Sequence, residues 1–245
     1  MVILNPSLKK SIKFSVVISV YLHDDVDYFI ESMNSILNQT LMPSEVILAV
    51  DGPVTSSIKD AIKNFESNPI VFVIRSDNNI GRGAIRHRAI LSSTTKIIAI
   101  MDSDDISADN RFELQVESLI NSKADFVGGY ISEFTHSIVD FKRERKVPLK
   151  HAEIIRRGKW IQPFNHVTIM FHKSMYIKSG GYAFTSVLED SYLFFRMVKN
   201  NAQFHNIPKT LVYVRANNDQ LLRRHGFKYF KEEFLTLINT IDVYF

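Results

Sequence analysis

The sequence predicts an α/β protein built on a doubly wound, mostly parallel sheet with flanking helices. Short aliphatic runs without strict alternation recur through the first half, as expected for parallel strands covered on both faces. Segments with helical spacing of apolar residues lie between these runs, so strand and helix alternate along the chain. The 245 residues are 45% hydrophobic, which is enough to bury a substantial core.

Five aliphatic runs are the expected strands of the first half. They span residues 14–20, 46–50, 70–74, 97–101 and 126–127. In a doubly wound sheet, ligands bind outside the carboxyl ends of the strands. Acidic or amide residues follow the first four runs, which makes these strand ends the expected site. No glycine-rich phosphate loop follows any of them, so the sequence has neither a P-loop nor a dinucleotide fingerprint.

Three helices are expected between these strands, because apolar residues recur at helical spacing in segments 29–37, 58–65 and 112–120. Thr55 and Asp109 precede the second and third segments and are favourable N-cap residues. The second half of the chain is less regular. Its expected elements are a helix at 151–157, a loop at 160–166, a strand at 167–171, a turn at Gly180–Gly181, a helix at 188–200, a strand at 211–215 and a final helix from Gly226.

Charge is distributed unevenly, although the net charge is only +4. Residues 24–125 carry 16 acidic and 9 basic side chains, whereas residues 141–245 carry 8 acidic and 18 basic ones. This division suggests different partners for the two halves, although an uneven solvated surface would give the same count. The basic residues are not interleaved with aromatic ones and no recognition helix or zinc finger is evident, so no nucleic-acid partner is expected.

Two absences from the sequence limit its chemistry and location. The chain has no cysteine, which excludes disulfides, thiolate metal sites and cysteine nucleophiles and fits a reducing compartment. The N-terminus has no apolar stretch of signal-peptide length, and no apolar run is long enough to span a bilayer. We therefore expect a soluble protein, or one bound to a membrane surface.

The most informative motif is the acidic cluster of Asp102, Asp104 and Asp105, which directly follows the strand expected at 97–101. Carboxylates this close repel one another unless a cation or hydrogen-bond donors compensate their charge. Mg²⁺ prefers oxygen ligands and usually takes one or two carboxylates together with substrate phosphates. A solvated turn with an acidic helix cap is the alternative, but the position after a buried strand favours a metal site.

Two other acidic positions each admit two interpretations. Asp51 and Gly52 end the second strand, where such a pair is typical of a turn but Asp51 could also bind a base or a ribose. Glu189 and Asp190 begin a helix, where carboxylates offset the macrodipole. A carboxylate at that position could equally serve as a general base.

Together these segments resemble the family 2 glycosyltransferases, which have the GT-A fold and act mainly in bacterial surface polysaccharide synthesis. The matching segments occur in the order of the family: FSVVISVY (14–21), SILNQT (35–40), PSEVILAVDG (43–52), NIG (79–81), DSDD (102–105), GGY (180–182) and ED (189–190). The resemblance implies one GT-A-like domain over 1–245. Its nucleotide-sugar-binding half would span about 12–130, and its less regular acceptor-side half about 131–245.

The resemblance also implies roles for residues on the donor side. Val20 and Tyr21 would line the nucleotide base, and Asp51 would contact uracil or ribose. Asp102 would hold the ribose or the sugar. Asp104 would bind Mg²⁺ or Mn²⁺, which bridges the donor diphosphate.

Other positions are assigned by the same resemblance to the diphosphate and the acceptor. Asp190 would be the general base, with Glu189 beside it. Arg223 and Arg224 follow Gln220 where the family often carries Gln-x-x-Arg-Trp, although the Trp is missing here. Glu189, Arg223 and Arg224 are therefore expected on the acceptor or phosphate side. Arginines that could help to hold the diphosphate follow the NIG segment at Arg82, Arg86 and Arg88.

The implied reaction is a single displacement on a nucleotide-diphosphate sugar, expected to be a UDP-sugar, with inversion at the anomeric carbon. A hexosyltransferase is expected, because the capsule and exopolysaccharide members that it most resembles include many galactosyltransferases. A sugar-phosphate nucleotidyltransferase is the alternative enzyme, although it would need a glycine-rich basic loop after the first strand. A non-catalytic Mg²⁺-binding signalling module is a further alternative.

The basic half suggests where the protein acts. We expect a glycan or lipid-linked acceptor, and a cytoplasmic location on the inner face of the cell membrane, because basic side chains are attracted to an anionic leaflet. The C-terminal apolar residues suit an interfacial helix and a core-packing helix equally well. The basic residues expected at the membrane are Lys142, Arg143, Arg145, Lys146, Arg156, Arg157, Lys159, Arg223 and Arg224.

Overall fold

Strand and helix alternate through the first half of the chain in the computed structural model, as the sequence predicts. The structure describes residues 9, 11–135, 137–182 and 189–216. The elements of this half are β1 (Ser15–Tyr21), α2 (Val26–Leu37), β2 (Glu45–Asp51), α3 (Ser56–Glu66), β3 (Val71–Ser76), α4 (Arg82–Ser92), β4 (Ile97–Asp102), β5 (Ile106–Ser107) and α5 (Arg111–Ser122).

Of the two N-caps that the sequence predicts, one is present and one is not. Thr55 caps α3 by accepting a hydrogen bond from the backbone N–H of Ile58 at 3.3 Å, as expected. The predicted cap of α5 was wrong. Asn110 holds the N-cap position, because α5 begins at Arg111, and neither Asn110 nor Asp109 makes the predicted side-chain cap.

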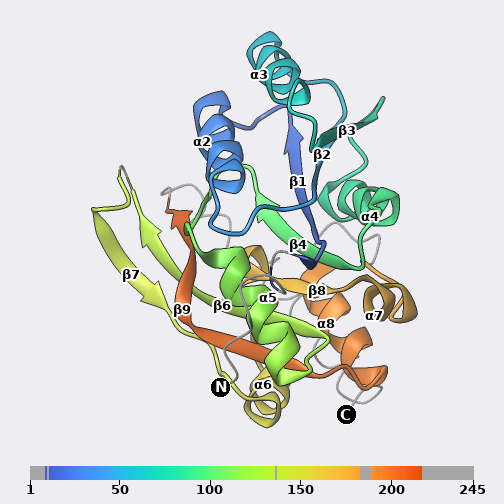
Figure 1. Ribbon diagram of the computed structural model, residues 1–245, viewed down its shortest axis with the longest axis vertical. Coiled ribbons are helices and arrows are strands. Elements are labelled where there is room, and N and C mark those ends of the chain that lie inside the picture. Colours follow the sequence, from blue (N-terminus) through green and yellow to red (C-terminus); the bar gives the residue numbers. More distant parts are fainter. Residues whose placement is uncertain (1–8, 10, 136, 183–188, 217–245) are drawn as a thin grey trace.

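The second half contributes further strands to the same sheet (Figure 1). Its elements are β6 (Phe126–Phe134), β7 (Phe141–Arg145), α6 (His151–Gly158), a 3₁₀ turn (His166–Thr168), β8 (Met170–His172), α7 (Lys173–Lys178), α8 (Glu189–Lys199) and β9 (Phe204–Arg215). The helix that the sequence predicts from Gly226 lies outside the described residues.

One sheet joins the two halves, in the strand order β3-β2-β1-β4-β8-β6-β9-β5, with β7 paired to β6. The strands β1 to β4 are parallel, and so are β6 and β9. The remaining pairings of β5, β7 and β8 are antiparallel. The predicted doubly wound sheet with flanking helices is confirmed, and its carboxyl-end edge is where β1, β2 and β4 finish.

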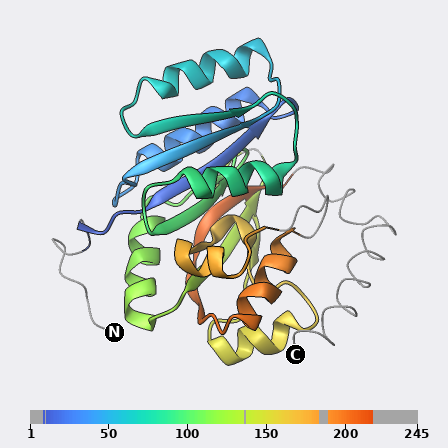
Figure 2. The ribbon, with the colours of Figure 1, turned by 90° about the vertical axis from the view of Figure 1, so that its right-hand side faces the viewer.

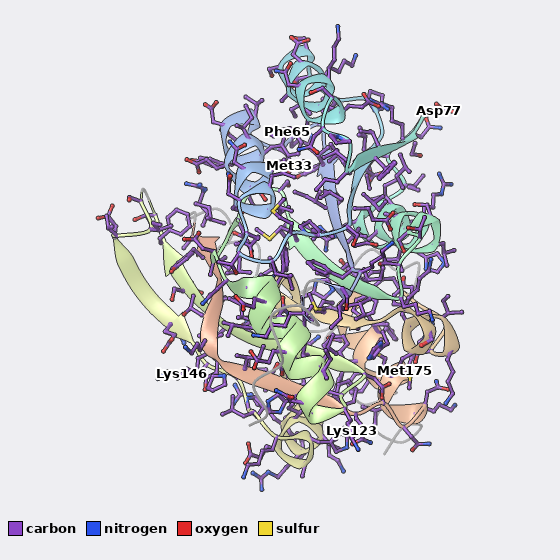
Figure 3. The ribbon with its side chains drawn as sticks, in the orientation of Figure 1. Met33, Phe65, Asp77, Lys123, Lys146 and Met175 are labelled. Carbon is purple, nitrogen blue, oxygen red and sulfur yellow. The ribbon has the colours of Figure 1, made fainter. Side chains whose placement is uncertain are left out.

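Two apolar cores cover the two faces of the sheet. Val16 and Ile18 of β1 belong to the core that α2, α3 and α5 close, whereas Val17 belongs to the one that α4 and α8 close. Figure 2 shows α3 and α4 on opposite faces of the first strands. Met33 of α2 belongs to the first core, and Phe65 of α3 packs against that core (Figure 3). Burial on both faces explains why these strands read as continuous aliphatic runs.

Candidate active site

A cavity of about 450 Å³ lies where β1, β2 and β4 end beside the first turn of α4. It brings together six residues that the sequence predicts for the donor side: Val20, Tyr21, Asp51, Arg82, Asp102 and Asp104. Other lining residues include Ser19, Asp24, Asn79, Gly81, Arg86, Ser103 and Asp105. The cavity thus occupies the strand-end position expected for a ligand in this fold.

Three carboxylates form a compact acidic cluster in the cavity wall. Asp102, Asp104 and Asp105 each place an oxygen atom within 4.8 Å of the others. Asp102 is the last residue of β4 and Asp105 directly precedes β5, so the short loop between the two strands fixes all three. Oxygen ligands at this spacing suit Mg²⁺ or Mn²⁺. The donor set therefore fits the predicted metal, with the half-buried Asp104 lining the cavity.

Arg86 compensates part of this negative charge. Its guanidinium forms an ion pair with the Asp102 carboxylate, and its Nε donates to Ser19 Oγ at 3.2 Å. Burial alone would raise the pKa of Asp102, but the charges of Arg86 and Arg82 outweigh it and lower the pKa to about 2. Asp102 is therefore ionised at neutral pH, and the buried Arg86 is paired rather than free to bind a ligand.

Arg82 lies exposed at the first position of α4, one turn before Arg86. The negative charges of Asp102, Glu189 and Asp104 raise the pKa of Arg82, and the protein atoms around the guanidinium oppose this shift by reducing its hydration. Glu189, in the first turn of α8, is therefore within electrostatic reach of the cavity. Arg88 is exposed on another part of the helix, so the three predicted arginines have three different environments.

Asp190 is half-buried in the first turn of α8, where its Oδ1 accepts a hydrogen bond from the Ser191 N–H at 2.8 Å. Its charge acts on His166: burial lowers the pKa of that imidazole, and Asp190 opposes this shift. Within the described part of the chain, neither Asp190 nor Glu189 lines the cavity itself. Arg223 and Arg224 lie outside the described residues.

Asp51 holds the loop that starts α4. Its buried carboxylate accepts hydrogen bonds from the N–H groups of Ile80 at 2.7 Å and Gly81 at 3.0 Å. Gly52 has φ +83°, and a Cβ there would lie 2.6 Å from the backbone nitrogen of Asn79. This close approach requires glycine. The Asp-Gly pair therefore shapes the cavity, and the predicted contact of Asp51 with uracil or ribose stays a prediction.

Asp24 is a cavity residue that the sequence prediction did not assign to the site. Its carboxylate accepts hydrogen bonds from the Tyr21 N–H at 3.0 Å and from Ser103 Oγ at 2.9 Å. Burial and, to a smaller extent, the charge of Asp104 together raise its pKa to about 6. Its place three residues after β1 was the available signal. Arg86 was predicted only as one of three arginines that could hold the diphosphate, and its pairing with Asp102 was not predicted.

The chain is similar to glycosyltransferases over most of its length. The family model described as Glycosyl transferase family 2 matches residues 15–180. An uncharacterised glycosyltransferase of Haemophilus influenzae is 32% identical over 90% of this chain and 82% of its own length. The amylovoran biosynthesis glycosyltransferase AmsE of Erwinia amylovora is 30% identical over the same shares.

The names of a further relative and of a structure with a similar fold each include a nucleotide sugar. An Escherichia coli protein named UDP-Gal:alpha-D-GlcNAc-diphosphoundecaprenol beta-1,3-galactosyltransferase is 30% identical over 89% of this chain and 79% of its own length. The structure of S. aureus TarS residues 1–349 in complex with UDP-GlcNAc superposes with a TM-score of 0.67 at 17% identity. That similarity covers 84% of this chain and 59% of the TarS chain, and it shows a shared fold.

Proposed function

The chain belongs to glycosyl transferase family 2, and on this premise we propose that it is an inverting, metal-dependent enzyme that transfers a hexose from a UDP-sugar to an acceptor hydroxyl. One observation carries the proposal: the carboxylates of Asp102 and Asp104 lie beside Arg82 in a single cavity at the ends of β1, β2 and β4. A diphosphate-metal complex needs carboxylates for the ion and a cation for the phosphates. Family membership favours this reaction over nucleotidyl transfer and over a signalling module.

On the donor side, we assign the metal to Asp104, with Asp102 beside it. When bound, Mg²⁺ or Mn²⁺ would offset the negative charge that grows on the leaving diphosphate. Arg82 is an exposed cation that lines the cavity, and we propose that its charge also binds the diphosphate. Val20 and Tyr21 line the cavity at the end of β1, where we place the base. Asp51 would orient the nucleotide directly and through the Ile80–Gly81 loop that it holds.

On the acceptor side, Asp190 is the proposed general base. As the acceptor oxygen bonds to the anomeric carbon, the bond from that carbon to the diphosphate oxygen breaks, and the hydroxyl proton passes to the Asp190 carboxylate. One displacement on the face opposite the leaving group inverts the configuration. The Ser191 N–H donates to Oδ1 at 2.8 Å, and this bond restrains the orientation of the carboxylate.

The relatives suggest the substrates to test first. The E. coli relative is named for a UDP-galactose donor and a diphosphoundecaprenol-linked acceptor, and AmsE is named for amylovoran biosynthesis. We therefore propose UDP-galactose as the first donor and a lipid-linked glycan as the acceptor in bacterial surface polysaccharide synthesis.

A lipid-linked acceptor implies a membrane partner, and the structure has a surface that suits one. This surface consists of four residues at the end of α6 and just after it: Arg156, Arg157, Trp160 and Ile161. We call it the Trp160 surface. Trp160 is 75% exposed and Ile161 is 47% exposed. Both arginines are exposed as well. Tryptophan beside basic residues suits the boundary of an anionic membrane.

The Trp160 surface lies next to the proposed base. The Nε2 atom of Gln162 donates to Ser191 Oγ at 3.5 Å, and Ser191 follows Asp190 in the first turn of α8. Lys146, exposed beyond β7 at another edge of the molecule (Figure 3), forms an ion pair with Glu144 at 3.2 Å, so we do not include it in this surface. No helix among the described residues is long and apolar enough to cross a membrane. We propose peripheral binding to the inner face of the cell membrane.

Donor turnover tests the proposed reaction. The protein is incubated with UDP-galactose, UDP-glucose or UDP-N-acetylglucosamine and Mn²⁺, and release of UDP is followed. Slow hydrolysis of one donor that stops in excess EDTA and resumes with Mn²⁺ is the expected result. Formation of a nucleotide sugar from UTP and a sugar phosphate would instead indicate a nucleotidyltransferase. Hydrolysis that is insensitive to EDTA would contradict the metal assignment.

A further inference from the structure

Arg215 is a buried cation at the end of the last strand, and it contacts the acidic loop of the candidate active site. Only 3% of the residue is exposed. Its backbone N–H donates to Asp105 Oδ1 at 3.0 Å, and its Nε donates to the backbone oxygen of Asp104 at 3.2 Å. These bonds join residues more than a hundred positions apart, so the acidic loop is built by both halves of the chain.

Other elements hold the same guanidinium in place. One of its terminal nitrogens donates to the Glu31 carboxylate of α2. Its Cζ atom lies 3.8 Å from the centre of the Tyr28 ring and 4.7 Å from that of Phe134. A buried guanidinium needs such pairing to offset its desolvation, and aromatic faces add to it. The planar side chain is therefore fixed by α2, β6 and the β4–β5 loop together.

Strand pairing fastens the acidic loop from its far side. Ile106 pairs with Tyr213, and Ser107 pairs with Val212, so β5 lies against β9 immediately before Arg215. The backbone N–H of Ala108 donates to the Leu211 oxygen at 3.0 Å. The acidic loop is therefore held on both sides of Asp104, by β4 before it and by the pairing of β5 with β9 after it.

Asp104 and Asp105 differ in their surroundings. Asp105 is 3% exposed, and one of its carboxylate oxygens already accepts the Arg215 N–H. Asp104 is half-buried and lines the cavity, while its carbonyl is held by the Arg215 side chain. The Asp105 carboxylate therefore links the acidic loop to β9, whereas Asp104 lines the cavity.

We infer that Arg215 is a positioning residue that fixes the direction of the Asp104 carboxylate, and that Asp105 belongs to this clamp and not to the metal coordination. The inference rests on the proposed function only in taking Asp104 as a ligand of the donor-bound metal. Partners that orient a metal ligand typically contribute roughly 10–100-fold to metal affinity. The clamp should therefore affect metal binding more than nucleotide binding.

Binding of Mn²⁺ and UDP to the full chain separates these roles, with UDP affinity measured by calorimetry both with Mn²⁺ and in excess EDTA. Asp104→Asn should lose the gain that Mn²⁺ gives to UDP binding. Asp105→Asn keeps an acceptor oxygen for the Arg215 N–H and should retain Mn²⁺ affinity within about threefold. Arg215→Met should lower Mn²⁺ affinity roughly 10–100-fold and leave metal-free UDP affinity unchanged. Arg75→Met, which removes an exposed positive charge of β3 that does not line the cavity, is the matched control and should match wild type.

A second substitution covers the case in which Arg215→Met does not fold. Glu31→Gln removes the negative charge that pairs with the Arg215 guanidinium and should therefore lower Mn²⁺ affinity. Asp27→Asn, at an exposed position of the same helix, is the control and should leave Mn²⁺ affinity unchanged. A loss of Mn²⁺ affinity in Asp105→Asn as large as in Asp104→Asn would make Asp105 a ligand and overturn the clamp. Wild-type Mn²⁺ affinity in Arg215→Met, or in Glu31→Gln, would overturn the positioning role. No effect of Mn²⁺ on wild-type UDP binding would overturn the metal assignment, and this inference with it.

Discussion

The Asp24 carboxylate accepts a hydrogen bond from the Ser103 hydroxyl at 2.9 Å, and this contact joins the loop after β1 to the acidic loop after β4. Burial raises the pKa of Asp24 to about 6, and the nearby Asp104 charge adds to the shift, while hydrogen bonds and Arg82 oppose it. Asp24 is therefore a carboxyl group that ionises close to physiological pH inside the candidate donor site.

The pH dependence of stability should reveal this group. Because the folded-state pKa of about 6 exceeds the ordinary value of 3.8, the folded protein binds the proton more tightly than the unfolded chain. Stability from Asp24 is complete below the ordinary pKa and is lost as pH rises through about 6. Asp24→Asn keeps an acceptor but does not ionise, so its free energy of unfolding relative to wild type should rise with pH, by about 2 kcal/mol.

Urea denaturation of wild type and Asp24→Asn at about pH 4.5 and about pH 7.5 checks this expectation. Asp60→Asn, on an exposed position of α3, is the matched control and should show no such change between the two pH values. If the difference in free energy of unfolding between Asp24→Asn and wild type is the same at both pH values, the pKa of Asp24 is ordinary.

The two cavity arginines should separate in their effects. Arg86 is buried and paired with Asp102, so Arg86→Met leaves a carboxylate without its partner and should destabilise the fold by about 3 kcal/mol. Arg82 is exposed, and Arg82→Gln should leave stability unchanged while raising the KM for the donor roughly tenfold, a loss of about 1.4 kcal/mol. Urea denaturation and donor kinetics measure the two quantities. A destabilised Arg82→Gln with unchanged KM would reverse these roles.

The general base can be separated from donor binding. Asp190→Asn removes the proton acceptor but keeps the side-chain shape, so transfer should fall by about 10²–10⁴-fold while UDP affinity stays near wild type. Glu189→Gln, one residue earlier in the same turn of α8, should cost much less. If Asp190→Asn retains full activity and Glu189→Gln does not, the base is Glu189.

The sequence predicts the strand-end half of this site well, because the pattern and the function depend on the same short segments. Each predicted strand of the first half ends within two residues of its observed end, except at the fifth, and the acidic cluster follows β4 as expected. The fifth strand, predicted at 126–127, extends to Phe134 as β6. The extension was not predicted, because Gly128 and Gly129 follow the aliphatic run and glycine is unfavourable in strands. A Cβ on Gly129 would lie 2.5 Å from Leu211 of β9, which explains the glycine there.

The contacts that complete the site join segments that are distant in the sequence, so no local sequence pattern predicts them. Arg215 reaches the acidic loop only because β9 pairs with β5 and β6. Its burial beside Tyr28 of α2 depends on the whole sheet. Residues Arg82 and Arg86 differ in exposure because one helix face lies against β1, which spacing alone did not resolve. The sequence therefore predicts which residues are at the strand ends, but not which of them are paired.

Membrane binding should depend on the Trp160 surface. Trp160 is 75% exposed and Ile161 is 47% exposed, so truncating them removes little packing from the folded protein. Each basic side chain near an anionic leaflet contributes about 1 kcal/mol, and exposed charges are screened by salt. The protein should therefore sediment with vesicles of phosphatidylglycerol at low ionic strength and be released at high ionic strength. Vesicles of phosphatidylcholine should bind it less.

Two substitutions test the location of that contact. Trp160→Ala combined with Arg157→Gln should reduce sedimentation with anionic vesicles at least about fivefold, since one charge and one aromatic anchor are lost. Phe72→Ala combined with Lys59→Gln is the matched control, because Phe72 is 50% exposed on β3 and Lys59 is exposed on α3. The control should sediment like wild type, and both variants should hydrolyse the soluble donor at the wild-type rate. Equal loss in the two variants would show that binding follows net charge alone, and no loss in either would remove the Trp160 surface from the membrane contact.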